Sequence, residues 1–246
     1  MASRLAAGNV TGALTAADAA VTNAPSDARA LVVAARTYGQ TRDFAKSEAL
    51  LKRAIQADPE LLEAYSLLGQ LYVDQKRLDE AMREFVALSA LQPTAVGPKT
   101  VIAVLHHVAN RRAQAKKAYE DVLRIDPSAV VAANNLAWMT VEDGGNLDVA
   151  LQLAQAAKAR APRSPEVSDT LGWIFYRRGL FAFAVAAFEE SVKEAPKNPE
   201  YHYRLGLALA KNGNARRAKE SLSTALALSQ SFPGAADAKA VLAGLP

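Results

Sequence analysis

The 246-residue chain contains no cysteine, few aromatic residues and no long apolar run. Without cysteine, disulfides and thiolate metal sites are excluded, and the redox state of the compartment is left open. A membrane-spanning helix needs a run of about 18 or more apolar residues, which this sequence lacks. The opening stretch, MASRLAAGNV, has no apolar segment typical of a secretory signal. The composition, half apolar and with modest glycine and proline, indicates a helix-rich globular chain.

Basic residues are scattered, although the formal net charge is +4. They occur as separate pairs such as Arg111-Arg112 and Arg216-Arg217, with acidic residues between the pairs. A nucleic-acid-binding surface needs a contiguous basic stripe. We therefore expect a solvated surface of mixed charge and no nucleic-acid partner.

Catalytic and cofactor-binding motifs are also missing. Of the three histidines, His106 and His107 are adjacent and point to different sides of a helix, and His202 has no partner nearby in the sequence. There is no HExxH motif, no glycine-rich phosphate loop and no His/Asp cluster with the spacing of metal ligands. We expect no enzymatic activity, no metal and no cofactor.

A regular series of prolines divides the sequence. Successive members are 34 residues apart, with one step of 35 where the turn EDGGN carries an extra residue. Proline cannot continue a preceding helix, because it lacks an N–H and its ring collides with the previous turn. The series is Pro25, Pro59, Pro93, Pro127, Pro162 and Pro196. Such a period predicts an array of similar helical units.

Each unit contains two amphipathic segments with apolar residues at helical spacing. The eighth residue of the first segment is always glycine or alanine, which allows two helices to approach closely. These residues are Ala35, Gly69, Ala103, Ala137, Gly172 and Gly206. In several units the second segment carries an inward-facing alanine and, four residues later, a larger apolar residue, as in Ala81 with Phe85.

These residues resemble the tetratricopeptide repeat, a helix-turn-helix unit of 34 residues. One unit follows that family's pattern almost fully, through Tyr65, Leu68, Gly69, Tyr72, Ala81, Phe85 and Pro93. The resemblance implies an all-α, right-handed α-solenoid of repeats with a C-terminal capping helix. It implies a single superhelical domain over residues 1–246. Its parts would be a partial repeat at 1–27, repeats at 28–61, 62–95, 96–129, 130–164, 165–198 and 199–232, and a capping helix at 233–246.

Residues 1–27 fit only the latter part of a repeat, with Gly8 in the turn and Ala13 and Ala17 in the second helix. Terminal units of an array need a polar outer face. We therefore expect this chain to be the C-terminal part of a longer array. At the other end, Ala235, Ala238, Leu242 and Leu245 would form the buried face of the capping helix.

Two similar pentapeptides, NNLAW at 134–138 and DTLGW at 169–173, place both tryptophans of the chain at position nine of a first helix. In the family, that position faces the concave groove. The residues predicted to bind a partner there are Asn134, Asn135, Trp138, Asp169, Trp173, Tyr176, Arg177, Tyr203, Arg204 and Lys211. Each tryptophan could bind a ligand, pack between neighbouring helices, or do both. The two asparagines could instead cap their helix.

The leading hypothesis is a non-catalytic protein–protein interaction scaffold that holds a peptide or partner segment in its groove. The tandem pentapeptides and the terminal helix are similar to the C-terminal ends of large bacterial repeat proteins. Those include lipoproteins linked to exopolysaccharide export and exosortase-type sorting, which favours the periplasm over the cytoplasm.

The alternative is direct binding of polysaccharide or nucleic acid through the aromatic strip. Acidic residues such as Glu166 and Glu200 on the same face disfavour RNA. Self-association through the partial repeat is a third hypothesis, and the sequence leaves the oligomeric state undetermined. A clamp for a C-terminal carboxylate is not expected, because only a single residue matches that motif in either register.

Overall fold

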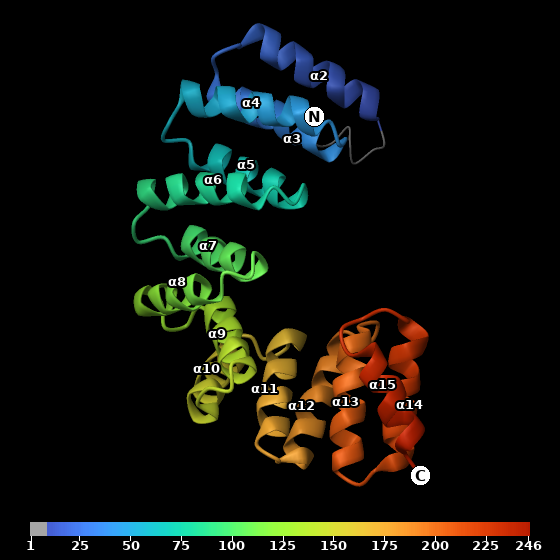
Figure 1. Ribbon diagram of the computed structural model, residues 1–246. Coiled ribbons are helices and arrows are strands. Elements are labelled where there is room, and N and C mark those ends of the chain that lie inside the picture. The colour runs from blue at the N-terminus through green and yellow to red at the C-terminus, as the bar shows by residue number, and fades with distance from the viewer. Residues whose placement is uncertain (1–8) are drawn as a thin grey trace. The chain divides into compact units, whose positions relative to one another are not determined.

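The computed structural model describes residues 9–246, and in this range the chain is helical with no β-strand. It contains 14 helices, α2 to α15, arranged as tandem pairs joined by short turns (Figure 1). The predicted all-α fold of repeated helical hairpins is confirmed. The chain divides into two compact units, Met1–Ala118 and Tyr119–Pro246.

Unit 1 begins, in its described part, with a single helix that packs against the first complete hairpin. The hairpins pair α3 with α4 and α5 with α6, and α6 then contacts α7. The helices are α2 (Val10–Asn23), α3 (Ala28–Gln40), α4 (Phe44–Ala57), α5 (Leu62–Asp74), α6 (Leu78–Leu91) and α7 (Val96–Val108). Ala13 and Ala17 of α2 are fully buried, whereas Gly8 lies outside the described residues. Helix α8 (Arg112–Ile125) carries the boundary between the units.

Unit 2 contains three hairpins and a final helix. Within it α9 pairs with α10, α11 with α12 and α13 with α14, and α15 packs on α14 and α13. The helices are α9 (Val130–Glu142), α10 (Leu147–Arg160), α11 (Pro165–Arg177), α12 (Phe181–Glu194), α13 (Pro199–Lys211), α14 (Ala215–Leu228) and α15 (Ala235–Gly244).

Local sequence signals set where the helices begin and end. Ser164 caps α11 by accepting a hydrogen bond from the Val167 amide, and Pro165 follows in the first turn, where its missing N–H costs nothing. Each turn inside a hairpin contains one residue with positive φ, which closes the end of the preceding helix. These residues are Arg42, Lys76, Asn110, Gly144, Gly179 and Gly213.

The small residue of the first helix brings the two helices of a hairpin into close contact. A Cβ added to Gly172 would lie 2.6 Å from the ring of Phe188, which is fully buried on the facing helix. At Gly69 the corresponding distance to the Phe85 ring would be 2.5 Å. Both distances are shorter than a van der Waals contact, so at these two positions a residue larger than glycine would overlap the facing ring.

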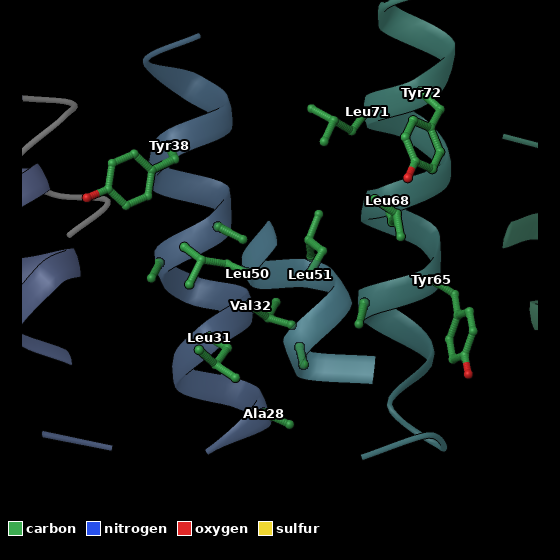
Figure 2. Packing of buried hydrophobic residues seen from close by; sticks show 14 of the residues in the cluster. Ala28, Leu31, Val32, Tyr38, Leu50, Leu51, Tyr65, Leu68, Leu71 and Tyr72 are labelled. Atoms are coloured by element: carbon green, nitrogen blue, oxygen red, sulfur yellow. The ribbon is translucent and has the colours of Figure 1, made fainter. Parts of the chain in front are cut away.

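The core of unit 1 runs through its stacked helices. Figure 2 shows Leu50 and Leu51 of α4 between the side chains of α3 and those of α5. Leu31, Leu51 and Leu68 are almost fully buried and belong to this one cluster. Within the described part of unit 1, neighbouring hairpins share this cluster and cover one another's apolar faces, as expected of a repeat array.

The final helix covers the end of unit 2. Ala235 and Ala238 are buried against Leu222 of α14, and Phe232 closes the same cluster. Leu242 and Leu245 are partly buried at its edge, and Leu245 follows the last residue of α15. The expected capping helix is therefore present, with Ala235 and Ala238 as the buried part of its face. In residues 9–246, no helix has both the length and the apolar character required to cross a membrane.

Candidate partner-binding face

The first helices of the three hairpins in unit 2 lie next to one another, since α11 contacts both α9 and α13. We call the surface formed by their exposed sides the helix-A face. Residues three, four and seven positions apart on a helix share a side. The spacing therefore brings Asp169, Trp173 and Tyr176 of α11 to this face, opposite Trp138 of α9 and Arg204 of α13.

Three aromatic rings stack along the helix-A face. The ring centroids of Trp138 and Trp173 are 6.3 Å apart at an interplanar angle of 27°. Trp173 and Tyr176 are 5.1 Å apart and almost parallel, at 5°. These separations lie in the range preferred by offset-stacked aromatic pairs. We call Trp138, Trp173 and Tyr176 the aromatic ladder.

The ladder is partly packed and partly accessible. All three side chains are half-buried. Trp173 packs at the edges of two core clusters, and its indole Nε1 donates a hydrogen bond of 2.9 Å to the Glu142 carboxylate. The structure therefore supports the packing interpretation for Trp173 and still leaves ring surface at the helix-A face. Ligand contact by the two tryptophans stays a prediction.

Arg204 joins the ladder to a group of carboxylates. Its guanidinium carbon lies 4.7 Å from the centroid of the Trp138 ring, a cation–π geometry. The same guanidinium forms ion pairs with Asp169 and, at 2.9 Å, with Glu200 one turn earlier on α13. Only 13% of the Arg204 side chain is exposed, so this cation is held in place from three sides.

Asp169 is an ionisable group inside the protein, with 5% of its surface exposed. Burial raises its pKa from the ordinary 3.8 to about 7, because removal from water disfavours the charged carboxylate. Arg204 opposes this shift, while the nearby carboxylates of Glu200 and Glu166 add to it. Asp169 Oδ1 is buried without a hydrogen-bond partner, as is Oδ1 of Asn134 on α9.

These groups surround a pocket of about 340 Å³ between α9, α11 and α13. We call it the polar pocket. Its lining is mostly polar and is shared by all three first helices. The lining residues are Asn134, Asn135, Trp138, Glu166, Asp169, Thr170, Asn198, Glu200, Tyr201 and Arg204. Trp138 belongs to both the pocket and the aromatic ladder, which makes the two features one continuous surface.

Beyond the other end of the ladder lies a second pocket, of about 500 Å³, between α13 and α15. Tyr176 and Lys211 line it together with Asp237 of the capping helix. Tyr203 donates a hydrogen bond of 2.8 Å to Asp237, and its ring lies against Gly234 so closely that no Cβ would fit there. Burial and the Asp237 carboxylate raise the pKa of Tyr203.

The predicted site residues thus separate into groups. Asn134 and Asp169 are buried in the polar pocket, whereas Arg177 and Lys211 are exposed. The capping role considered for the asparagines is wrong, because α9 begins without a side-chain cap and Asn135 instead donates to the Tyr119 hydroxyl at 3.0 Å.

Sequence reasoning missed Tyr201 and Asn198. They lie at the start of α13, outside the positions that the repeat pattern assigns to the groove. Nothing in the repeat pattern singles them out, since their place in the pocket depends on how α13 packs beside α11.

Comparison with known proteins gives a consistent result. Family models described as tetratricopeptide repeat match residues 40–96, 103–165 and 170–218, which together exceed half of the chain. Repeats of this family generally act as non-catalytic scaffolds for protein interactions. Comparison with curated proteins gives no match.

Several solved structures have the same fold. The chain matches the crystal structure of the APC/C hetero-tetramer Cut9–Hcn1 with a TM-score of 0.77 and 14% identity, covering 98% of this chain and 47% of that one. It therefore spans about half the length of that protein. It matches pilF of Pseudomonas aeruginosa with a TM-score of 0.73 and 12% identity, covering 87% and 97%.

A third structure, PilW, is described as a type IV pilus biogenesis factor. It gives a TM-score of 0.69 and 19% identity, covering 87% of this chain and 98% of that one. At such identities the similarity extends to the fold alone. With the matched family models and the repeated hairpins in agreement, the chain belongs to the tetratricopeptide repeat family.

Proposed function

We propose that unit 2 binds an extended peptide segment of a partner protein on its helix-A face. The observation that carries this proposal is the aromatic ladder, three half-buried rings in one continuous stack beside a polar pocket. Binding hot spots are enriched in tryptophan, tyrosine and arginine, because these side chains bury much area at low entropic cost. The helix-A face contains all three residue types.

The arrangement favours non-covalent binding of a peptide over catalysis. Stacked rings offer flat apolar surface to the side chains of a peptide, and the amides and carboxylates of the polar pocket offer hydrogen bonds. Arg204 is fixed by Asp169, Glu200 and Trp138, so the surface is formed before a ligand arrives. Preorganisation reduces the entropic cost of binding.

We propose that this interaction takes place in the bacterial envelope, in the periplasm, and that it serves exopolysaccharide assembly. Its support is the similarity of NNLAW, DTLGW and the terminal SFPGAADAKAVL segment to the ends of large bacterial repeat lipoproteins. Membership of a longer, anchored protein is part of the same proposal. Fractionation of the producing cells, with detection of the natural protein in each fraction, tests it, and recovery in the cytoplasm alone would contradict it.

The binding proposal is tested by selecting peptides from a random display library on the immobilised chain. The selected peptides are then measured against the double variant Trp138→Ala, Trp173→Ala. We expect at least about a tenfold loss of affinity with helix content unchanged by circular dichroism, because two hot-spot rings are removed.

The matched control is Phe183→Ala, which removes an aromatic ring that is 61% exposed on the second helix α12 of the same unit. This variant should bind like the wild type. Peptides that depend on Phe183 and not on the tryptophans would contradict the proposal. Binding of exopolysaccharide to the helix-A face, without binding of any peptide, would also contradict the proposal.

A further inference from the structure

The polar pocket contains more acceptor capacity than the protein uses. Asn134 Oδ1 and Asp169 Oδ1 are both buried and both lack a hydrogen-bond partner. Both residues are buried, with 9% of the surface of Asn134 and 5% of that of Asp169 exposed, and each lines the pocket. Unsatisfied buried polar atoms are rare in folded proteins, and each one costs stability. Two in one pocket, from two different helices, indicate a site for a donor group.

The charges of the pocket point to the kind of donor. Three carboxyl groups line it, those of Glu166, Asp169 and Glu200, against the single guanidinium of Arg204. Arg204 is already engaged by two of these carboxylates and by the Trp138 ring. The pocket therefore presents an excess of negative charge together with its unpartnered acceptors. A cation with several N–H groups would neutralise the excess charge and donate to the unpartnered acceptors, whereas an anion would do neither.

We propose that the polar pocket receives the ammonium or guanidinium group of a lysine or arginine side chain of the bound partner segment. Asp169 Oδ1 and Asn134 Oδ1 accept its hydrogen bonds. Trp138, which belongs to both pocket and ladder, allows one side chain of a segment lying on the ladder to reach the pocket. The inference rests on the proposed function and adds a specificity to it, a basic residue in the ligand.

This site couples ligand binding to the protonation of Asp169. The charged groups facing Asp169 are Arg204 and Glu200 from α13 and Glu166 from its own helix, while α9 contributes the amides of Asn134 and Asn135. With its pKa raised to about 7, the carboxyl is partly protonated near neutrality. A bound cation favours the charged form. Binding therefore releases a proton and becomes tighter as the pH rises from about 6 to about 8.

The test uses blocked glycine pentapeptides with a single central residue as probes. One probe contains arginine, a second lysine and a third citrulline, a neutral side chain with the shape of arginine. Binding is followed by the indole Nε1 signal of Trp138 and the side-chain amide signals of Asn134 in nuclear magnetic resonance spectra. We expect the arginine and lysine probes to shift these signals with saturation, and the citrulline probe to bind about tenfold more weakly or not at all.

Two variants probe the pocket itself, because a single one could fail to fold. Asp169→Asn removes the charge and keeps the volume, and Asn134→Leu removes the amide acceptor. Each should weaken arginine binding about tenfold and leave citrulline binding unchanged. The control, Glu220→Gln, removes a carboxylate paired with Arg216 on the exposed side of α14 and should bind the arginine probe normally.

The outcomes separate this inference from the proposed function. Equal binding of arginine and citrulline probes, or undiminished arginine binding by both pocket variants, overturns the inference. The pocket signals could instead saturate with spermidine at concentrations where the arginine probe does not bind. The ligand would then be a free polyamine and not a side chain of a partner, and the inference would be overturned. Selected peptides that need the two tryptophans but contain no basic residue leave the proposed function standing. A specific arginine effect without any tryptophan-dependent peptide supports the pocket and contradicts the proposed function.

Discussion

Asp169 should make the free energy of unfolding of unit 2 depend on pH, and the substitution Asp169→Asn should remove this dependence. Its pKa rises from 3.8, the value expected in the unfolded chain, to about 7 in the folded protein. The folded state therefore holds the proton more tightly than the unfolded state, and the free energy of unfolding falls as the pH rises through this window. Below about pH 4 the group is protonated in both states and has no such effect.

The size of the effect follows from the shift. About three pKa units at about 1.4 kcal/mol per unit give a total loss of about 4 kcal/mol. Of this, about 2 to 3 kcal/mol falls between about pH 5 and about pH 8. Asp169→Asn carries no titrating proton, so its free energy of unfolding should gain this amount relative to the wild type across that interval.

Urea unfolding at several pH values, followed by tryptophan fluorescence, measures the difference. Both tryptophans of the chain lie in unit 2, so their emission reports on the unit that contains Asp169. Asp148→Asn is the matched control for the loss of one charge, because it removes a carboxylate that is 72% exposed in the same unit. If Asp169→Asn and the wild type keep the same difference in stability from about pH 5 to about pH 8, the buried-carboxyl reasoning is refuted.

Two glycines give further predictions on the fold. Gly172→Ala should lower the free energy of unfolding by about 1 to 3 kcal/mol in urea titrations, because its Cβ would overlap the buried Phe188 ring. Unchanged stability would contradict the close helix contact. Gly179→Ala should lower it by about 1 to 2 kcal/mol, since the turn holds this residue at a φ of 74° with open space around it. Gly97→Ala in α7, where a Cβ meets no atom within 4 Å, is the control and should not destabilise.

Much of the fold could be predicted from the sequence, because the same physical requirements recur along the chain. A proline after a helix, as at Pro162, and a small residue facing a larger side chain, as at Gly172, are local constraints that the repeat period makes visible. The ladder was partly predictable for the same reason, since position nine of successive first helices shares one face. The burial of the capping helix followed from its apolar spacing.

The polar pocket was less predictable. Asn134 and Asp169 were expected on an open strip, but the structure buries them beside Tyr201 and Arg204 of α13. Whether a polar residue of a first helix is exposed depends on the size and orientation of side chains from the next repeat. Those orientations result from packing between helices, and the repeat pattern of the sequence does not reveal them.

The most direct test of the central claim uses the two tryptophans, the only ones in the chain, as reporters. A peptide selected on the immobilised chain is titrated into ¹⁵N-labelled protein, and both indole Nε1 signals are followed. If the helix-A face binds the peptide, both signals shift and saturate at the stoichiometry and affinity found by calorimetry. Calorimetric binding that leaves both indole signals unmoved would contradict the account.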